Sequence, residues 1–187
     1  MKSLLIADDE PLIRRQVREA VASYGFDSIL EGESGTQALA LGLAEKPLAA
    51  ILDVSMPGMD GVSVAEKLIR ERPLPIVLLT ATRDADTIAR AREAGISHYL
   101  LKPFDPDQLR VTLELAMHQF MELHQLREEN ERLKQTLETR KLVDRAKGVL
   151  MGRGLSEAEA YRKLQKLAMD RRKSLREVAE AVLLAEG

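Results

Sequence analysis

Ala49-Ala50-Ile51-Leu52-Asp53 is the stretch that decides the fold, because an uninterrupted apolar run ends there at a carboxylate. The same arrangement occurs at residues 3–8, 75–80 and 98–102, which end at Asp8, Thr80 and Lys102. Short apolar runs without polar alternation are typical of strands buried on both faces, as in a parallel sheet. Open parallel sheets bind ligands beyond the carboxyl ends of their strands. The sequence therefore predicts one site where these polar residues meet.

The polar residues at the strand ends indicate a site for a metal ion and a phosphoryl group. Asp9 follows Asp8 directly, so that three carboxylates, with Asp53, would share one small volume. Clustered carboxylates repel one another unless a cation lies among them, and Mg²⁺ accepts a few carboxylates together with waters and phosphate oxygens. Lys102 would supply a positive charge and Thr80 a hydroxyl group to a phosphoryl group. We interpret the set as a phosphorylation site and not as a pocket that converts a metabolite.

The composition bounds the class of protein. At 187 residues, 45% of them hydrophobic and 31% charged, the chain can form one ordinary domain and a smaller one and stay soluble. It has no Cys, which excludes disulfides and thiolate metal sites. We find no signal peptide and no apolar run long enough to span a bilayer, so we expect a cytoplasmic protein without a membrane partner.

The net charge of −2 conceals an asymmetry along the chain. Residues 1–138 carry 16 Lys and Arg against 23 Asp and Glu, whereas residues 139–187 carry 12 against 7. The two parts therefore have net charges of −7 and +5. Such an asymmetry favours an anionic partner for the basic end. The alternative is a helical tail whose Lys and Arg side chains are simply solvated.

Strand runs alternate with helical patterns over residues 1–120. This alternation predicts an α/β domain in which five parallel strands form a sheet with helices on both faces. The last helical pattern starts near Asp105 and contains no Gly or Pro from Asp107 to Lys147. We therefore expect a long helix that extends beyond the first domain.

Residues 121–138 of this helix carry a short heptad pattern that predicts a coiled-coil linker. Its a and d positions are Leu123, Leu126, Asn130, Leu133 and Leu137. An Asn at an a position sets the register of two-stranded parallel coiled coils, and Glu122 would face Arg127 of a second chain. We expect a homodimer through this segment. The pattern is shorter than the about three or four heptads usually needed, so the alternative is one amphipathic helix packed on its own protein.

Residues 139–187 predict a small all-α domain of three helices. Apolar positions at helical spacing, ended by Gly152, predict the first helix. Two Ser-x-x-Glu sequences, at 156–159 and 174–177, have the spacing of capping boxes and predict where the second and third helices begin.

One family combines these polar strand ends. The matching residues are Asp8, Asp9, Asp53, Thr80, Lys102 and the segment Met56-Pro57-Gly58-Met59-Asp60-Gly61. Together they resemble the receiver domain of response regulators over residues 1–120. The resemblance implies a flavodoxin-like fold, Mg²⁺ as the cofactor and a sensor histidine kinase as the partner. The alternative is a receiver that no longer takes phosphate, and retention of every matched position disfavours it.

The same resemblance implies roles for individual residues. Asp53 is the expected phosphoacceptor, and Thr80 and Lys102 would bind the phosphoryl oxygens. The expected metal ligands are Asp9, Asp53 and the carbonyl of Ser55, with Asp8 acting through water. Tyr99 matches an aromatic switch position, which turns inward when the threonine moves toward the phosphoryl group. Lys102-Pro103 matches a peptide bond that is usually cis.

The C-terminal part resembles the ANTAR domain of RNA-binding antiterminators. The match covers Arg140-Lys141-Leu142-Val143-Asp144-Arg145-Ala146-Lys147-Gly148-Val149-Leu150-Met151, together with Ala160-Tyr161, Ala168-Met169 and the helix at 175–179. The resemblance implies binding to RNA stem-loops. The residues expected to contact RNA are Arg145, Ala146, Lys147, Gly148, Tyr161, Arg171, Arg172 and Lys173.

The residues themselves support part of this expectation. Gly148 inside a helix costs about 1 kcal/mol relative to Ala, so either a neighbouring helix or an RNA loop would approach the backbone there. Arg145, Lys147 and the basic run at 171–173 suit contacts with phosphates. Tyr161 could stack on an unpaired base, although a lone tyrosine at such a position more often belongs to a core.

The two resemblances together predict a two-component response regulator that controls transcription and is not an enzyme. Phosphorylation of Asp53 would favour a dimer that binds paired RNA stem-loops in a nascent leader transcript. Such binding would prevent terminator formation and so act on RNA polymerase indirectly. The alternatives are a DNA-binding response regulator with a helix-turn-helix, or a helical output domain that binds another protein. The basic residues do not lie along one exposed recognition helix, which disfavours DNA.

Overall fold

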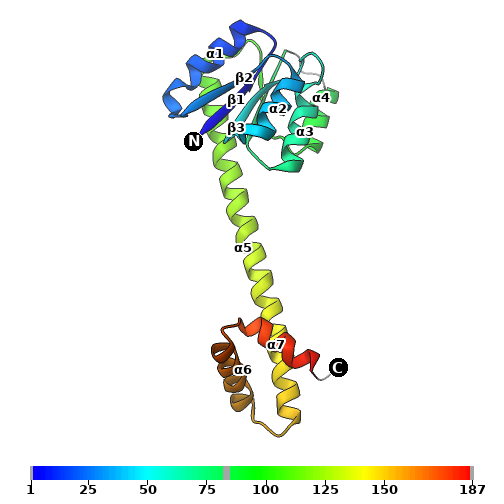
Figure 1. Cartoon of the computed structure of the whole chain (residues 1–187). Coiled ribbons are helices and arrows are strands. Elements are labelled where there is room, and N and C mark those ends of the chain that lie inside the picture. The colour runs from blue at the N-terminus through cyan, green and yellow to red at the C-terminus, as the bar shows by residue number, and fades with distance from the viewer. Residues whose placement is uncertain (1, 82–84, 186–187) are drawn as a thin grey trace. The chain divides into compact units, whose positions relative to one another are not determined.

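The computed structural model describes residues 2–81 and 85–185 (Figure 1). The predicted domains also include residues 1, 82–84 and 186–187, which lie outside the described part. The chain divides into two compact units, Met1–Leu123 and His124–Gly187. None of the described helices combines the length and the hydrophobicity that a membrane span requires.

The first unit is built on a five-stranded parallel sheet. Its strands are β1 (Ser3–Ala7), β2 (Ser28–Gly32), β3 (Ala49–Asp53), β4 (Ile76–Thr80) and β5 (His98–Leu101). They lie in the order β2-β1-β3-β4-β5, and all neighbouring strands are parallel. This is the flavodoxin-like order of a doubly wound fold, whose direction of winding reverses between β1 and β3. The predicted fold class is therefore confirmed.

Helices cover both faces of this sheet. They are α1 (Pro11–Val21), a short 3-10 helix η1 (Ala22–Tyr24), α2 (Gly35–Glu45), α3 (Gly61–Glu71), α4 (Ala85–Glu93) and the start of α5 (Pro106–Gly152). One core packs α2, α3 and α4 against alternate strand residues such as Leu5 and Leu52, and the other packs α1 and α5 against Leu4 and Ile51. Every residue of β1, β3 and β4 is buried. The apolar runs thus form strands with two buried faces, as expected.

The second unit contains three helical segments around a separate core. The end of α5 packs with α6 (Glu157–Arg171) and α7 (Leu175–Leu184). Buried residues of this core include Val143, Ala160, Leu164 and Val178. The predicted first helix is not a separate element, because α5 continues without a break from the linker to Gly152. Both predicted capping boxes are present, at the start of α6 and of α7.

The leucines of the predicted coiled coil remain on the surface of the single chain. Leu123, Leu126, Leu133 and Leu137 are between 47% and 67% exposed. The alternative, in which this part of α5 packs on its own protein, is therefore not what the described residues do. Dimerisation through this segment stays a prediction.

Candidate functional sites

Three carboxylates meet at the carboxyl edge of the sheet, where two adjacent strands end. Asp53 is the last residue of β3, while Asp8 and Asp9 directly follow β1, the neighbouring strand. One oxygen of each carboxylate lies within 4.8 Å of the others. Asp8 is fully buried and Asp53 is 3% exposed, whereas Asp9 is exposed to solvent. The site therefore has a buried floor and one carboxylate at its opening.

Lys102, which follows β5, bridges the two buried carboxylates. Its Nζ lies 2.7 Å from Asp8 Oδ2 and 2.8 Å from Asp53 Oδ1, and only 11% of its side chain is exposed. Burial lowers the pKa of Lys102, but the hydrogen bonds and charges of Asp53 and Asp8 outweigh burial and raise it above its ordinary value. The lysine is therefore a permanent cation in the site.

Asp8 retains acceptor capacity that suits a metal ion. Burial raises the pKa of Asp8, against the hydrogen bonds from Lys102 and the Glu10 backbone, which lower it. Apart from the ion pair with Lys102, Asp8 Oδ2 meets no hydrogen-bond donor among the described residues. Carboxylate oxygens are the ligands that Mg²⁺ prefers, with waters completing its octahedron. The donor set and its spacing therefore fit Mg²⁺.

The Asp53 carboxylate is held from two sides. Asp53 Oδ1 faces Lys102, and its Oδ2 accepts a hydrogen bond from the Ser55 N–H at 2.8 Å. Behind it, the start of α3 packs directly onto the strand end, because a Cβ at Gly61 would lie 2.0 Å from the Asp53 carbonyl oxygen. Only glycine permits this approach. Contacts with Lys102 and Ser55 therefore hold the Asp53 carboxylate, and the close packing of α3 holds the backbone from which it projects.

The remaining receiver residues belong to the two strands that follow β3 in the sheet, β4 and β5. Thr80 ends β4 and is 5% exposed, and its carbonyl accepts the Lys102 N–H at 2.8 Å. Tyr99 lies on β5 and is 46% exposed. The Lys102–Pro103 peptide bond is cis. The structure therefore brings Thr80 and Lys102 to the carboxylates and leaves Tyr99 at the surface.

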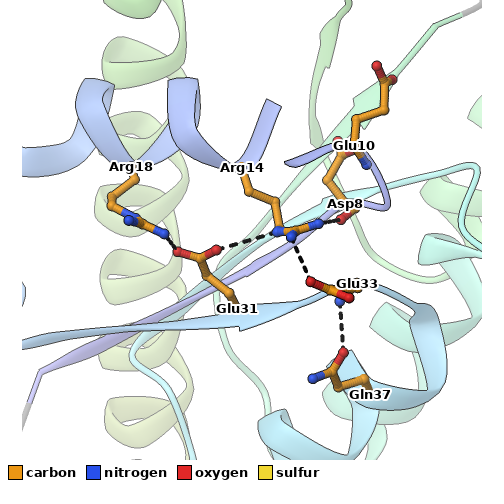
Figure 2. A network of polar contacts seen from close by, with 7 residues as sticks. All are labelled: Asp8, Glu10, Arg14, Arg18, Glu31, Glu33 and Gln37. Atoms are coloured by element: carbon orange, nitrogen blue, oxygen red, sulfur yellow. Dashed lines mark hydrogen bonds and ion pairs between the residues drawn. The ribbon is translucent and has the colours of Figure 1, made fainter. Parts of the chain in front are cut away.

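Two residues near the site did not emerge from the sequence. Glu10 Oε1 lies 3.7 Å from Lys102 Nζ. Arg14 of α1 is only 7% exposed and contacts the Asp8 backbone and two glutamates (Figure 2). Leu12 of the same helix is 64% exposed. The burial of Arg14 could have been inferred from helical spacing, because Arg14 lies three residues before the buried Val17 on α1.

The motif residues of the second unit separate into three environments. Ala146 is fully buried in the core, so its side chain cannot contact RNA and the prediction is corrected to a packing role. Lys147 is only 16% exposed, and its Nζ lies 2.8 Å from both Asp144 Oδ1 and Glu157 Oε1. Arg145 and Gly148 are exposed. No atom of a neighbouring element in the described chain lies within 4 Å of a Cβ built at Gly148, so no helix of this chain accounts for the glycine.

The other residues expected at the RNA interface lie on or after α6. Tyr161 is 40% exposed and does not belong to the core, contrary to the more frequent role of such a tyrosine. Arg171, Arg172 and Lys173 are exposed where α6 ends. Lys173 Nζ lies 3.6 Å from Glu177 Oε1, a surface pair of little strength. All of these side chains are accessible to a partner.

Family comparisons agree with the fold and with both predicted family resemblances. The family model for the response regulator receiver domain matches residues 4–114, and the ANTAR domain model matches residues 131–183. The chain therefore belongs to the response regulators that join a receiver domain to a C-terminal ANTAR domain.

Individual relatives share either the whole architecture or the receiver alone. The transcriptional regulatory protein PdtaR of Mycobacterium tuberculosis strain H37Rv is 42% identical over 183 residues, which span 97% of this chain and 89% of the relative. The DNA-binding response regulator MtrA of Mycolicibacterium smegmatis is 34% identical over 106 residues, 57% of this chain and 46% of its own. A CheY-like response regulator receiver domain protein from Methanospirillum hungatei has a similar fold. Its TM-score is 0.61 at 22% identity, covering 65% of this chain and 98% of that one.

Proposed function

We propose that phosphorylation of Asp53 switches this response regulator to a dimer that binds RNA stem-loops and causes transcription antitermination. Receiver domains interact with sensor histidine kinases and ANTAR domains bind RNA. The observation that carries the proposal is the cation of Lys102, whose side chain is 11% exposed and whose Nζ lies 2.7 and 2.8 Å from Asp8 and Asp53, near the exposed Asp9. A fixed cation next to a poised carboxylate is what a phosphoryl group entering this edge would require.

The proposed reaction moves a phosphoryl group onto Asp53. A carboxylate oxygen of Asp53 forms the new O–P bond while the N–P bond of a phosphohistidine breaks. Lys102 then exchanges one carboxylate partner for a phosphoryl oxygen, and the Thr80 hydroxyl can donate to another. When bound by Asp9, Asp53 and the Ser55 carbonyl, Mg²⁺ would neutralise charge on the carboxylates and on the phosphoryl oxygens.

The conformational change would begin at Thr80 and reach the surface that includes Tyr99 of β5. Movement of Thr80 toward the phosphoryl group would give the exposed Tyr99 ring space to turn inward, which alters the surface formed by α4, β5 and α5. A shift from 1% to 99% of the active form needs about 5.5 kcal/mol of differential stabilisation. A few charge-assisted hydrogen bonds at about 1.5–3 kcal/mol each suffice. The exposed leucines of α5 are the surface that a second chain would then cover.

RNA binding is supported by the face that α5 leaves open in the second unit. Lys141, Arg145 and Gly148 follow one another at spacings of four and three residues, so they lie on one side of the helix. All three are exposed, whereas Val143 and Ala146 on another side are buried. Two cations beside a position without a side chain would let a phosphate backbone approach closely. Arg145 is therefore the residue that best tests the interface.

The test measures binding of the full-length protein to a tandem-hairpin RNA, with and without beryllofluoride as the phosphoryl mimic. Duplex DNA competes, and the salt concentration is varied. We expect tighter, RNA-selective binding with beryllofluoride, no such gain for Asp53→Asn, and a salt slope smaller by about 1 for Arg145→Ala. Arg15→Ala removes an exposed arginine of the first unit and serves as the charge-matched control.

Each part of the proposal has its own contrary result. Equal gain for wild type and Asp53→Asn would contradict the acceptor assignment. Preference for duplex DNA would favour the DNA-binding alternative. Absence of salt-dependent binding to either nucleic acid would leave the receiver in place and favour a protein partner for the second unit.

A further inference from the structure

A buried arginine lies directly behind the acidic site and joins three segments of the first unit (Figure 2). Arg14 Nη1 donates to the Asp8 carbonyl at 2.8 Å, and Nη2 donates to Glu33 Oε1 at 2.8 Å. Its Nε reaches Glu31 Oε2 of β2 at 3.4 Å. Arg14 is 7% exposed, and its guanidinium group links α1, the end of β1 and the end of β2.

These contacts fix the backbone from which two of the three carboxylates project. The Asp8 N–H donates to the Gly32 carbonyl at 3.1 Å, and the Asp8 carbonyl accepts from Arg14. Both polar groups of the Asp8 main chain are thus held, and the peptide bond between Asp8 and Asp9 has a set orientation. On the side chain, Asp8 Oδ1 accepts the Glu10 N–H at 3.0 Å, which leaves Oδ2 directed to Lys102.

The charges behind the site balance one another. Arg18 pairs with the same Glu31 that Arg14 contacts, so two arginines face two glutamates, Glu31 and Glu33. Little net charge remains to act on the carboxylates from this side. Arg14 can therefore contribute to the positions of the carboxylates, whereas it adds little to the electrostatic field that acts on them.

We propose that Arg14 is a positioning residue for the Mg²⁺ site: it holds the Asp8 carbonyl so that Asp8 and Asp9 present their carboxylates to one ion. The inference rests on the proposed function of this acidic cluster. A planar guanidinium can donate to three acceptors in fixed directions, whereas a lysine ammonium on a flexible stem cannot reproduce that fork. Partners outside the metal ligands matter in this way, and their loss weakens metal affinity by about 10- to 100-fold.

The test compares Mg²⁺ binding by calorimetry among four full-length variants and the wild type. Arg14→Lys keeps the charge and loses the fork. Arg14→Met removes the cation, and the double variant Arg14→Met with Glu33→Gln removes one charge of each sign, which leaves the net charge unchanged. Arg15→Lys alters the adjacent exposed arginine, which pairs with Glu19, and is the control. Thermal unfolding without Mg²⁺ is recorded for each.

We expect the Mg²⁺ dissociation constant to rise about 10-fold in all three Arg14 variants and to stay unchanged in Arg15→Lys. A purely electrostatic role predicts the opposite sign for Arg14→Met, since loss of a nearby cation should tighten Mg²⁺ binding. It predicts no change for the double variant. These predictions separate position from charge.

Two results would overturn the inference. Unchanged or tighter Mg²⁺ binding in Arg14→Met and in the double variant would show that Arg14 does not position the ligands. A lower melting temperature with an unchanged dissociation constant would reduce Arg14 to a support of the fold. Failure of the wild type itself to bind Mg²⁺ is a different result, because it would remove the proposed metal site along with the role of Arg14.

Discussion

The two units of this chain hold their functional residues in opposite ways. In the first, the buried Asp8 and Asp53 pair with Lys102, whose side chain is 11% exposed. In the second, Arg145 stands on an exposed helix face, while Lys147 is occupied within its own unit. Buried charges must be paired within the fold before any partner binds, because unpaired buried charges are costly. A surface that reads a partner has no such requirement.

Glycine shows the same contrast. At Gly61 a side chain would collide with the Asp53 carbonyl, whereas at Gly148 it would meet open space. The first glycine is required by the packing of its own unit. The second has no structural reason within the described chain, and the proposed contact with RNA would supply one. Substituting each glycine by alanine gives the largest expected effects and tests the contrast directly.

Gly61→Ala should destabilise the first unit by about 3 kcal/mol, because overpacking between two backbone segments costs at the upper end of the usual range. The 2.0 Å approach to the Asp53 carbonyl oxygen cannot be relieved by a side-chain rotation. Urea denaturation followed through amide resonances of β3 measures the loss, and phosphorylation by a small phosphodonor should slow as the acceptor shifts. Wild-type stability in this variant would mean that α3 can move away from β3 without cost, which would contradict a rigid acidic site.

Gly148→Ala should act in the opposite sense on the second unit. Replacing an exposed glycine within a helix by alanine stabilises it by about 1 kcal/mol, and the Cβ meets nothing in the described chain. The same Cβ would obstruct a phosphate backbone, so we expect weaker binding to hairpin RNA despite a more stable domain. Gly152→Ala, at another open position near the end of α5, is the matched control. Stabilisation with unaltered RNA affinity would remove Gly148 from the interface.

Much of the first unit was predictable because its constraints are local and repeated. Four apolar runs ending at polar residues predict parallel strands, and strands in one sheet bring those ends together. The burial of Arg14 was not predictable from the apolar pattern, since a charged residue turns inward only when the fold supplies acceptors such as the Asp8 carbonyl and Glu33. The pattern therefore predicted where the site lies and missed what supports it.

Less of the second unit could be predicted, and the reason is physical. Capping boxes predicted where α6 and α7 begin, because caps are local. The motif around Arg145 gave no means of separating the buried Ala146 from the paired Lys147 and the open Gly148. Adjacent helical residues point in different directions, and which direction is outward depends on where α6 and α7 pack. The boundary between linker and first helix was likewise invisible, because α5 has no break there.

The smallest expected effect concerns the caps of the second unit, where the carboxylates are exposed. Hydrogen bonds from the Ser156 hydroxyl and backbone lower the pKa of Glu159, and those from the Ser174 backbone and hydroxyl lower the pKa of Glu177. A carboxyl group with a lowered pKa in the folded state contributes stability above its unfolded value of 4.5 and loses it as the pH falls through the folded value.

The stability of α6 and α7 should therefore decline as the pH falls below about 4.5, the range in which free glutamates take up protons. The double variant Glu159→Gln with Glu177→Gln keeps a residue that can complete a capping box but cannot titrate, so its decline should be shallower. Thermal unfolding followed through amide resonances of these helices at pH 6 and pH 3 makes the comparison. Other acidic residues, such as Asp144, contribute equally to both proteins and cancel. Parallel pH profiles would mean that the caps act through geometry alone, and that the carboxylates of Glu159 and Glu177 contribute no charge-dependent stability.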